Sequence, residues 1–188
     1  MTSQSPPERF IGLDIHKHYL VAAGVDANKP QVLPFQRVEW QQFGAWKRRT
    51  LTKRDAVVFE MTTNTWEVYD ALVEHVHSVT VVHPPHVALI TRARVMNDKR
   101  TSLILAQLHA AGLLVGIGVP PLDVRELRTL IAECWKLVKI AALAKTRLHN
   151  VLHRHHLEPP KGSQPFHAKH EEFWLNLALT PAEQAAVR

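Results

Sequence analysis

The sequence has little cysteine, little glycine and no long apolar run. Cys134 is its one cysteine among 188 residues, so an intrachain disulfide and a zinc site of several thiolates are both excluded. The seven glycines are scattered, and no glycine-rich loop for a nucleotide phosphate is present. No run approaches the roughly 20 apolar residues of a membrane span, and the N-terminus lacks a signal-peptide core. We therefore expect no membrane association and a reducing, cytoplasmic location.

The charge balance is basic. There are 23 Lys and Arg against 17 Asp and Glu, a formal net charge of +6, and 13 histidines that could add positive charge beside phosphate. The pI near 9.7 is compatible with a polyanionic partner such as nucleic acid, although many proteins of similar charge bind none.

The apolar pattern predicts a mixed α/β fold. Three strands joined by short polar links come first, then a short amphipathic helix, then strands that alternate with helices. This layout is typical of an RNase H-like fold with helices flanking a mixed sheet. The predicted strands cover residues 10–15, 19–25, 31–38, 55–59 and 79–82, and the predicted helices cover residues 40–50, 64–77, 84–92 and 98–112.

Three acidic residues stand where a predicted strand ends or a predicted helix begins. Asp14 and Glu60 each follow an apolar run, and Asp98 opens the helix expected over residues 98–112. Such carboxylates can converge on divalent metal, because Mg²⁺ prefers oxygen ligands and two ions about 4 Å apart support phosphoryl transfer. Acids at strand ends are also common as turn residues or helix caps, so spacing alone leaves both interpretations open.

Several short segments have a specific amino-acid sequence and follow one another in a specific order. They are residues 12–17, 59–66, 83–84, 97–100, 105–108, 124–128, 147–150 and 152–156. Together they resemble the DEDD-type insertion-sequence transposases with a RuvC-like domain, which are bridge-RNA-guided recombinases and relatives of pilin-gene invertases. The resemblance covers nearly the whole chain.

The resemblance implies a RuvC-like domain that holds Mg²⁺ or Mn²⁺ in a two-ion site for DNA strand cleavage and transfer. Asp14, Glu60 and Asp98 match the family's first three acids, and Thr101 falls on the fourth. Thr101 shares a helix face with Asp98 but carries no charge. We therefore expect weakened metal binding and an impaired or inactive chain. The alternative is that an acid from elsewhere completes the site, with Asp55 or Asp123 as candidates.

The partners implied by the resemblance are DNA, a structured guide RNA and further copies of the chain, as a dimer or higher oligomer. The implied setting is the bacterial or archaeal cytoplasm, in association with the nucleoid. In the family, a coiled-coil region joins the RuvC-like domain to a C-terminal domain with a nucleophilic serine. The present sequence ends before such a domain, so we expect a truncated gene product.

A long helix is predicted from Leu122 to Glu158, because this stretch has neither Gly nor Pro. Its apolar residues alternate spacings of three and four, which indicates a coiled-coil seam. Positive charge gathers in its second half and suits a phosphate backbone, although a merely solvated basic face is equally open. The seam residues are Leu127, Leu130, Cys134, Leu137, Ala141, Ala144, Leu148, Val151 and His155. The candidate nucleic-acid contacts are Lys17, Lys99, Arg100, Lys136, Lys139, Lys145, Arg147, His149, His153 and Arg154.

The expected domains are a disordered lead (1–8), a RuvC-like catalytic-type domain (9–118), a long basic helical arm (119–158), and a linker with the start of a helical segment (159–188). Thr180 and Glu183 form a capping-box pattern. The helix that they begin is expected to be marginal, with nothing to pack on.

Two other functions stay open. Thr101 and the early end favour a non-catalytic nucleic-acid-binding or oligomerisation module derived from a transposase. An ATP-using enzyme of the actin and sugar-kinase kind also begins with Gly-x-Asp and a hairpin, but it needs a second phosphate loop and a larger second domain. The histidine-rich stretches at 16–18 and 153–156 could suggest zinc, yet neither has Cys or Glu at ligand spacing.

Overall fold

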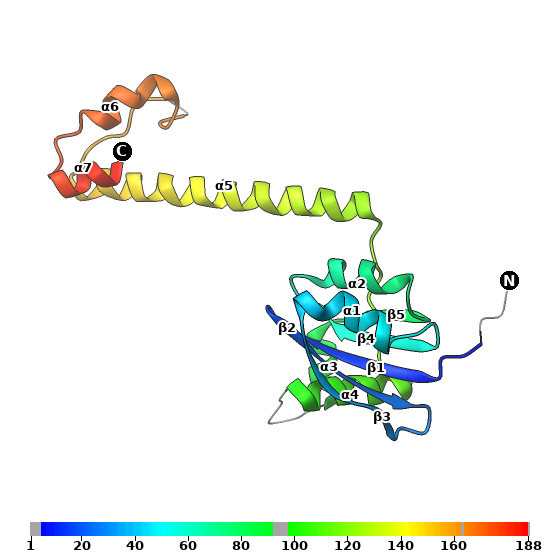
Figure 1. Cartoon of the computed structure of the whole chain (residues 1–188). Helices are drawn as coiled ribbons and strands as arrows, with labels where there is room; N and C mark the ends of the chain where they lie inside the picture. Colours follow the sequence, from blue (N-terminus) through cyan, green and yellow to red (C-terminus); the bar gives the residue numbers. More distant parts are fainter. Residues whose placement is uncertain (1–4, 92–97, 163, 188) are drawn as a thin grey trace. The chain divides into compact units, whose positions relative to one another are not determined.

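The computed structural model describes residues 5–91, 98–162 and 164–187. The chain divides into two units, residues 1–119 and 120–188 (Figure 1). Each unit has hydrophobic clustering of its own. Of the lead expected over residues 1–8, residues 1–4 lie outside the described part, and residues 5–7 have no regular secondary structure.

The first unit is built on a five-stranded mixed sheet with the strand order β3-β2-β1-β4-β5 (Figure 1). The first three strands pair antiparallel, and β4 and β5 continue the sheet parallel to β1. This sheet confirms the predicted meander and α/β class, and it is consistent with an RNase H-like layout. The bounds are β1 Arg9–Ile15, β2 Tyr19–Asp26, β3 Gln31–Glu39, β4 Asp55–Glu60 and β5 Ser78–Val82.

Helices flank this sheet: α1 Trp40–Thr50, α2 Thr65–Val73, α3 Pro84–Thr91 and α4 Asp98–Ala110. The helix expected over residues 64–77 is shorter than predicted. Asn64 occupies the N-cap position without a side-chain capping bond. Instead, the hydroxyl of Thr65 accepts a hydrogen bond from the backbone N–H of Thr62 at 2.6 Å.

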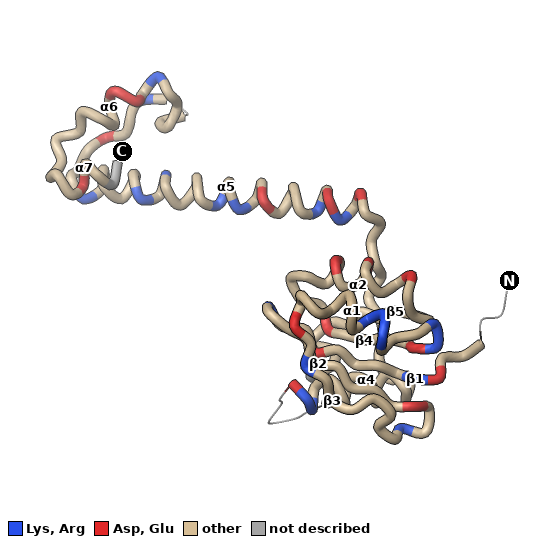
Figure 2. The backbone as a smooth tube through the Cα atoms, viewed as in Figure 1, with Lys and Arg blue, Asp and Glu red and all other residues tan. Residues whose placement is uncertain are grey.

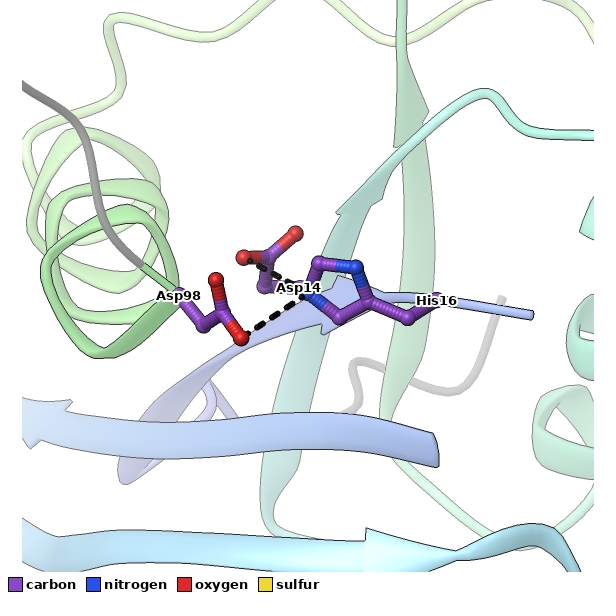
Figure 3. A group of neighbouring side chains, drawn as sticks. All are labelled: Asp14, His16 and Asp98. Atoms are coloured by element: carbon purple, nitrogen blue, oxygen red, sulfur yellow. Dashed lines mark ion pairs between the residues drawn. The ribbon is translucent and has the colours of Figure 1, made fainter. Parts of the chain in front are cut away.

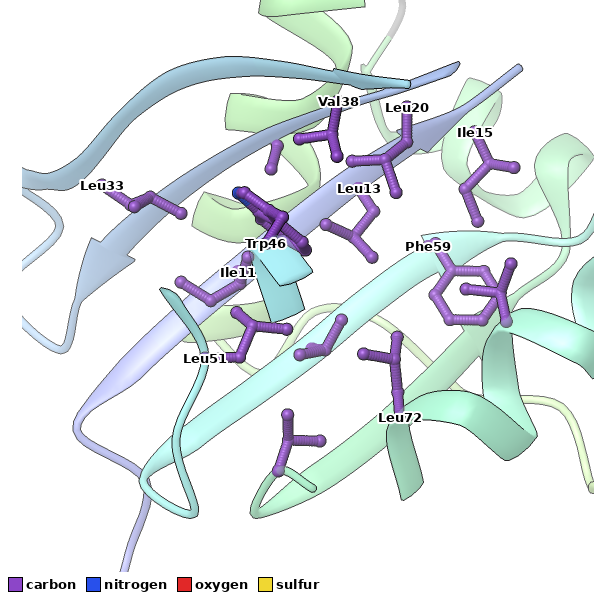
Figure 4. Packing of buried hydrophobic residues seen from close by; sticks show 14 of the residues in the cluster. Ile11, Leu13, Ile15, Leu20, Leu33, Val38, Trp46, Leu51, Phe59 and Leu72 are labelled. Atoms are coloured by element: carbon purple, nitrogen blue, oxygen red, sulfur yellow. The ribbon is translucent and has the colours of Figure 1, made fainter. Parts of the chain in front are cut away.

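The main core lies between the sheet and the helices α1 and α2 (Figure 4). Because side chains alternate along a strand, Ile11 and Leu13 of β1 enter this core together with Val57 and Phe59 of β4. Each is fully buried, and burial of such a side chain contributes about 1.5–3 kcal/mol. The alternate residues of β1 and β4 therefore belong to the opposite face, where a second cluster joins Val58 to Leu105 of α4.

Helix α4 lies directly against β1 at Gly12. A Cβ on Gly12 would lie 2.0 Å from the carbonyl oxygen of Ser102 and 2.8 Å from the backbone nitrogen of Ala106. Ser102 is fully buried and donates its hydroxyl to the carbonyl of Lys99 at 3.0 Å. The missing side chain at Gly12 thus allows close backbone contact, which brings the start of α4 to the end of β1.

The second unit begins with α5, Leu122–Arg154, a continuous helix of 33 residues. The helix ends four residues before the predicted Glu158. His156 has a positive φ of 52°, and the N–H of Leu157 bonds back to the carbonyl of Leu152 at 2.9 Å, an arrangement that ends many helices. A coiled coil needs a second helix, so the predicted seam remains a prediction.

The tail folds onto the end of α5 through η1 Ala168–His170, α6 Glu171–Leu175 and α7 Pro181–Val187. Trp174 and Leu177 are buried in one cluster with Leu152. In α7, Glu183 lies 3.3 Å from Arg154 and accepts a bond from the Thr180 hydroxyl at 3.0 Å. The helix that begins after Thr180 was expected to have nothing to pack on, whereas Glu183 of α7 contacts Arg154 and His155 at the end of α5. Among the described residues, no helix has the length and apolar character to cross a bilayer.

Candidate metal centre

Two strand ends and a helix start meet on the α4 side of the sheet. Asp14 is near the end of β1, Glu60 ends β4 and Asp98 is the first residue of α4. The strands β1 and β4 are parallel, with Leu13 opposite Phe59, so Asp14 and Glu60 occupy equivalent places on adjacent strands. Side-chain alternation turns both toward the face that α4 covers.

Asp14 and Asp98 meet at a third residue, His16 (Figure 3). The Nε2 atom of His16 is 3.3 Å from Oδ2 of Asp14 and 3.4 Å from Oδ2 of Asp98. One potential ligand atom from each of the three side chains lies within 4.8 Å of the others. His16 was missed as a member of this site by sequence reasoning. The available signal was its spacing of two from Asp14, which predicts a side chain on the same face of an extended chain.

Tyr19 at the start of β2 is a second residue that sequence reasoning missed. Its hydroxyl donates a hydrogen bond to Oδ2 of Asp98 at 2.9 Å. Its ring lies against the imidazole of His16, with centroids 4.6 Å apart, and the guanidinium of Arg37 lies 3.4 Å from the ring centre. Tyr19 thus orients both the histidine and one of the carboxylates.

The pKa values of two carboxyl groups are raised here. Burial is the main cause for Asp14, and the charge of Asp98 adds to it, while His16 opposes the rise. Burial also raises the pKa of Glu60, and the charge of Asp14 contributes. These directions mean that the ionised carboxylates repel one another and lack full solvation. A divalent cation would relieve both costs.

The donor set fits such a cation. Asp14 and Asp98 offer carboxylate oxygens and His16 offers an imidazole nitrogen, and these donors suit divalent ions from Mg²⁺ to the first-row transition metals. Glu60 is outside the group of three but close enough for its pKa to respond to Asp14.

Thr101 lies one turn along α4 from Asp98 and is half-buried, with an uncharged hydroxyl where the family pattern has an acid. Asp55 cannot replace that acid, because it begins β4 at the end opposite Glu60. Its buried carboxylate accepts bonds from Nε and Nη2 of Arg9 at 2.6 and 2.7 Å. The other candidate, Asp123, belongs to α5 in the second unit.

The basic candidates near the acids are exposed. Lys17 lies in the turn between β1 and β2, and Lys99 and Arg100 lie in the first turn of α4. The local backbone therefore places three cations next to the acidic group.

The basic candidates on α5 include several with partners inside the chain. Figure 2 shows the charges along this helix. Lys136 pairs with Glu133 at 2.5 Å, and Arg154 pairs with Glu183. Phe166 lies under Lys145 at 5.8 Å and edge-on to His149 at 4.9 Å. The remaining three, Lys139, Arg147 and His153, are exposed.

A mixed sheet with acidic side chains gathered beside its first strand defines a class of α/β folds whose carboxylates could hold a divalent cation. A family model described as transposase, that of the DEDD transposases of the IS110 type, matches residues 11–157. The match covers more than half of the sequence, and the chain belongs to this transposase family. It begins within β1 and includes the rest of the sheet and all of α5. A search of curated proteins found no match.

Proposed function

We propose that the first unit is the RuvC-like, RNase H-like domain of an insertion-sequence transposase, and that it binds Mg²⁺ or Mn²⁺ for DNA strand cleavage and transfer. The observation that carries the proposal is the meeting of Asp14 and Asp98 from distant parts of the chain, with Glu60 beside Asp14. A bound cation would offset the repulsion among these carboxylates.

Each residue has a distinct task in this proposal. Asp14 and Asp98 hold the metal, and Glu60 extends the acidic surface for a second ion. When bound, the metal activates a nucleophile and neutralises charge on the phosphate. Lys17 and Lys99 hold the phosphodiester through its charged oxygens.

We propose that Thr101 weakens this site and leaves the chain impaired or inactive in catalysis, because three carboxylates stand in place of four. Thr101→Asp should bind Mn²⁺ more tightly than the parent chain, since a fourth carboxylate adds a hard ligand on the same face as Asp98. Asp14→Ala should bind no metal at the site. Isothermal titration calorimetry with Mn²⁺ measures all three proteins.

Equal affinities for the parent and Thr101→Asp would show that position 101 is not part of the site. Unchanged binding by Asp14→Ala would remove the metal site itself from the proposal. Thermal unfolding of each variant establishes that the sheet is intact before titration.

Nucleic acid, as DNA and a structured guide RNA, is the proposed partner of the basic side chains. The exposed Lys139 and Arg147 on α5 are the best placed, since others on that helix pair within the chain. Lys139→Gln and Arg147→Gln should each weaken binding and lower the slope of log affinity against log salt by up to about 0.9 for duplex DNA. Fluorescence anisotropy at several salt concentrations gives the slope.

The matched control is Lys29→Gln in the turn between β2 and β3, which removes one exposed charge from the first unit. An equal loss in this control would mean that net charge, not the face of α5, governs binding.

A non-catalytic module derived from a transposase is the second candidate function. Thr101 favours it, because binding of nucleic acid does not require a complete acidic set. In that case Thr101→Asp would gain metal affinity without any gain in DNA cleavage, while the parent chain would still bind nucleic acid.

We also propose that the parts of the chain divide these tasks. Residues 9–118 carry the acidic site, residues 119–158 carry nucleic-acid contacts and pairing with another copy, and residues 159–188 brace the end of α5. The assembly is a homo-oligomer, a dimer or higher. The proposed location is the bacterial or archaeal cytoplasm, at the nucleoid.

A further inference from the structure

The imidazole of His16 is held in one orientation by its surroundings. Its backbone N–H donates to the carbonyl of Tyr19 at 2.9 Å, and its carbonyl accepts from Nε1 of Trp40 at 3.0 Å. The ring then lies against the ring of Tyr19. These contacts fix both ends of the side chain before any ligand binds.

The fixed orientation aims Nε2 between two carboxylates (Figure 3). This atom is inaccessible to solvent, and its contacts with the two carboxylates are at ion-pair distance without good hydrogen-bond geometry. A buried polar atom without such a bond is costly. Because the atom lies next to two carboxylate oxygens, a cation bound by all three groups would offset this cost.

The spacing suits coordination. Nitrogen and oxygen ligands bind a small divalent ion at about 2.1 Å, so neighbouring ligand atoms around it are about 3.0–3.4 Å apart. The observed separations of Nε2 from the oxygens of Asp14 and Asp98 are 3.3 and 3.4 Å. The ligand atoms of Asp14 and Asp98 lie within 4.8 Å of each other, so one ion could contact all three side chains.

We propose that His16 is a direct metal ligand, and that the centre is a mixed nitrogen and oxygen site formed by Asp14, His16 and Asp98. The inference rests on the proposed metal site at Asp14 and Asp98 and changes its chemistry. The imidazole nitrogen of His16 adds a ligand atom to a site that has Thr101 in place of the fourth acid. Imidazole binds Mn²⁺ and other transition metals better than Mg²⁺, whose ligands are mostly oxygen. The chain should therefore prefer Mn²⁺ to Mg²⁺.

The test uses the full chain with Mn²⁺ alone. Electron spin echo envelope modulation of the bound Mn²⁺ should show coupling to a histidine ¹⁴N nucleus. In His16→Asn this coupling should disappear, and Mn²⁺ affinity should fall by at least about tenfold, the scale at which ligand shells respond to mutation. Mg²⁺ affinity, measured by competition, should fall by a smaller factor. The matched control is His18→Asn, an exposed histidine two residues further on, which should keep both coupling and affinity.

The outcomes separate this inference from the proposed function. Loss of Mn²⁺ binding in Asp14→Ala, with no ¹⁴N coupling in the parent chain, keeps the metal site and overturns the role of His16. Coupling that persists in His16→Asn also overturns it. No Mn²⁺ binding by the parent chain overturns both. Absence of ¹⁴N coupling in the parent chain overturns the inference without any substitution, so it remains falsifiable even if His16→Asn fails to fold.

Discussion

At the scale of single residues, Gly12 determines how close the acidic groups can come. Without a side chain on this residue, the backbone of α4 touches β1 at Ser102 and Ala106. Asp98 stands one turn before Ser102, so its distance from Asp14 depends on this contact. The glycine is thus a positioning residue for the metal centre although it has no functional group.

Gly12→Ala should destabilise the chain by about 1–3 kcal/mol or more, because its Cβ would overlap backbone atoms that cannot rotate away. The same shift should separate Asp98 from Asp14 and weaken Mn²⁺ binding. Urea unfolding and calorimetry measure the two effects. Gly44→Ala in α1 is the control, since its Cβ would meet only the end of Arg48 at 3.7 Å and alanine favours a helix. If Gly12→Ala matched this control, the close contact would have no energetic role.

His16 shows what residue-level reasoning from sequence missed. The spacing from Asp14 predicts the same face of the strand, but the direction of the ring depends on Tyr19 and Trp40, which lie later in the chain. Asp14 and Asp98 could be selected from sequence because a carboxylate at a strand end or helix start is informative by itself. A histidine surrounded by His18 and Lys17 is informative only when its neighbours in space are known.

At the scale of elements, α4 carries both Asp98 of the candidate metal centre and a buried histidine. His109 near its C-terminus meets the ring of Phe10 edge-on, with centroids 5.6 Å apart. Its Nε2 atom is buried, with no hydrogen bond to it in the described part of the chain. Burial lowers the pKa of His109 below the ordinary value of 6.5. The attachment of α4 to β1 should therefore respond to pH.

The lowered pKa of His109 decides whether stability rises or falls with pH. Because the pKa of His109 is lower in the folded state, the imidazole is protonated in the unfolded chain at a higher pH than in the folded chain. The free energy of unfolding should therefore decrease as pH falls below about 6.5. His109→Leu, which cannot be protonated, should gain stability relative to the parent chain between pH 7 and pH 5. Urea unfolding at each pH measures the difference. The exposed His153→Asn is the control, and a difference that does not change with pH would contradict the prediction.

The elements were predicted from sequence where a repeating pattern was long enough. All five strands and the helices α1 and α4 follow from alternation or helical spacing. The ends of α2 and α5 were placed too late, because their apolar residues continue past the last helical turn. The packing of the tail was not predicted, for a different reason. Its apolar residues, among them Trp174 and Leu177, pack on Leu152 from another element, and such a contact has no local pattern.

At the scale of the whole molecule, α5 presents exposed apolar side chains that belong to none of the three hydrophobic clusters of the described residues. Leu130, Trp135 and Leu137 are 68%, 62% and 67% exposed, which is unusual for side chains of this size. Two of the three belong to the predicted seam, and Cys134 lies between them and is exposed as well. We expect this surface to be covered by the same helix of another copy.

Leu130→Lys with Leu137→Lys should lower the mass in solution, because like charges would face each other across the seam. Light scattering at several concentrations measures the mass. Arg125→Gln with Arg128→Gln on the same helix controls for a change of charge. A monomeric parent chain, or an oligomer that survives the double lysine variant, would contradict association through this seam.

The exposure of α5 has a thermodynamic consequence. A helix receives most of its stability from packing of its apolar face, and the middle of α5 has little packing within its own chain. If that packing comes from another copy, the helix content of the protein depends on its concentration, through mass action. Dilution would then unwind the middle of α5 and leave the sheet with its acids folded, so that the abundance of the protein in the cell decides whether the second unit contains one continuous helix.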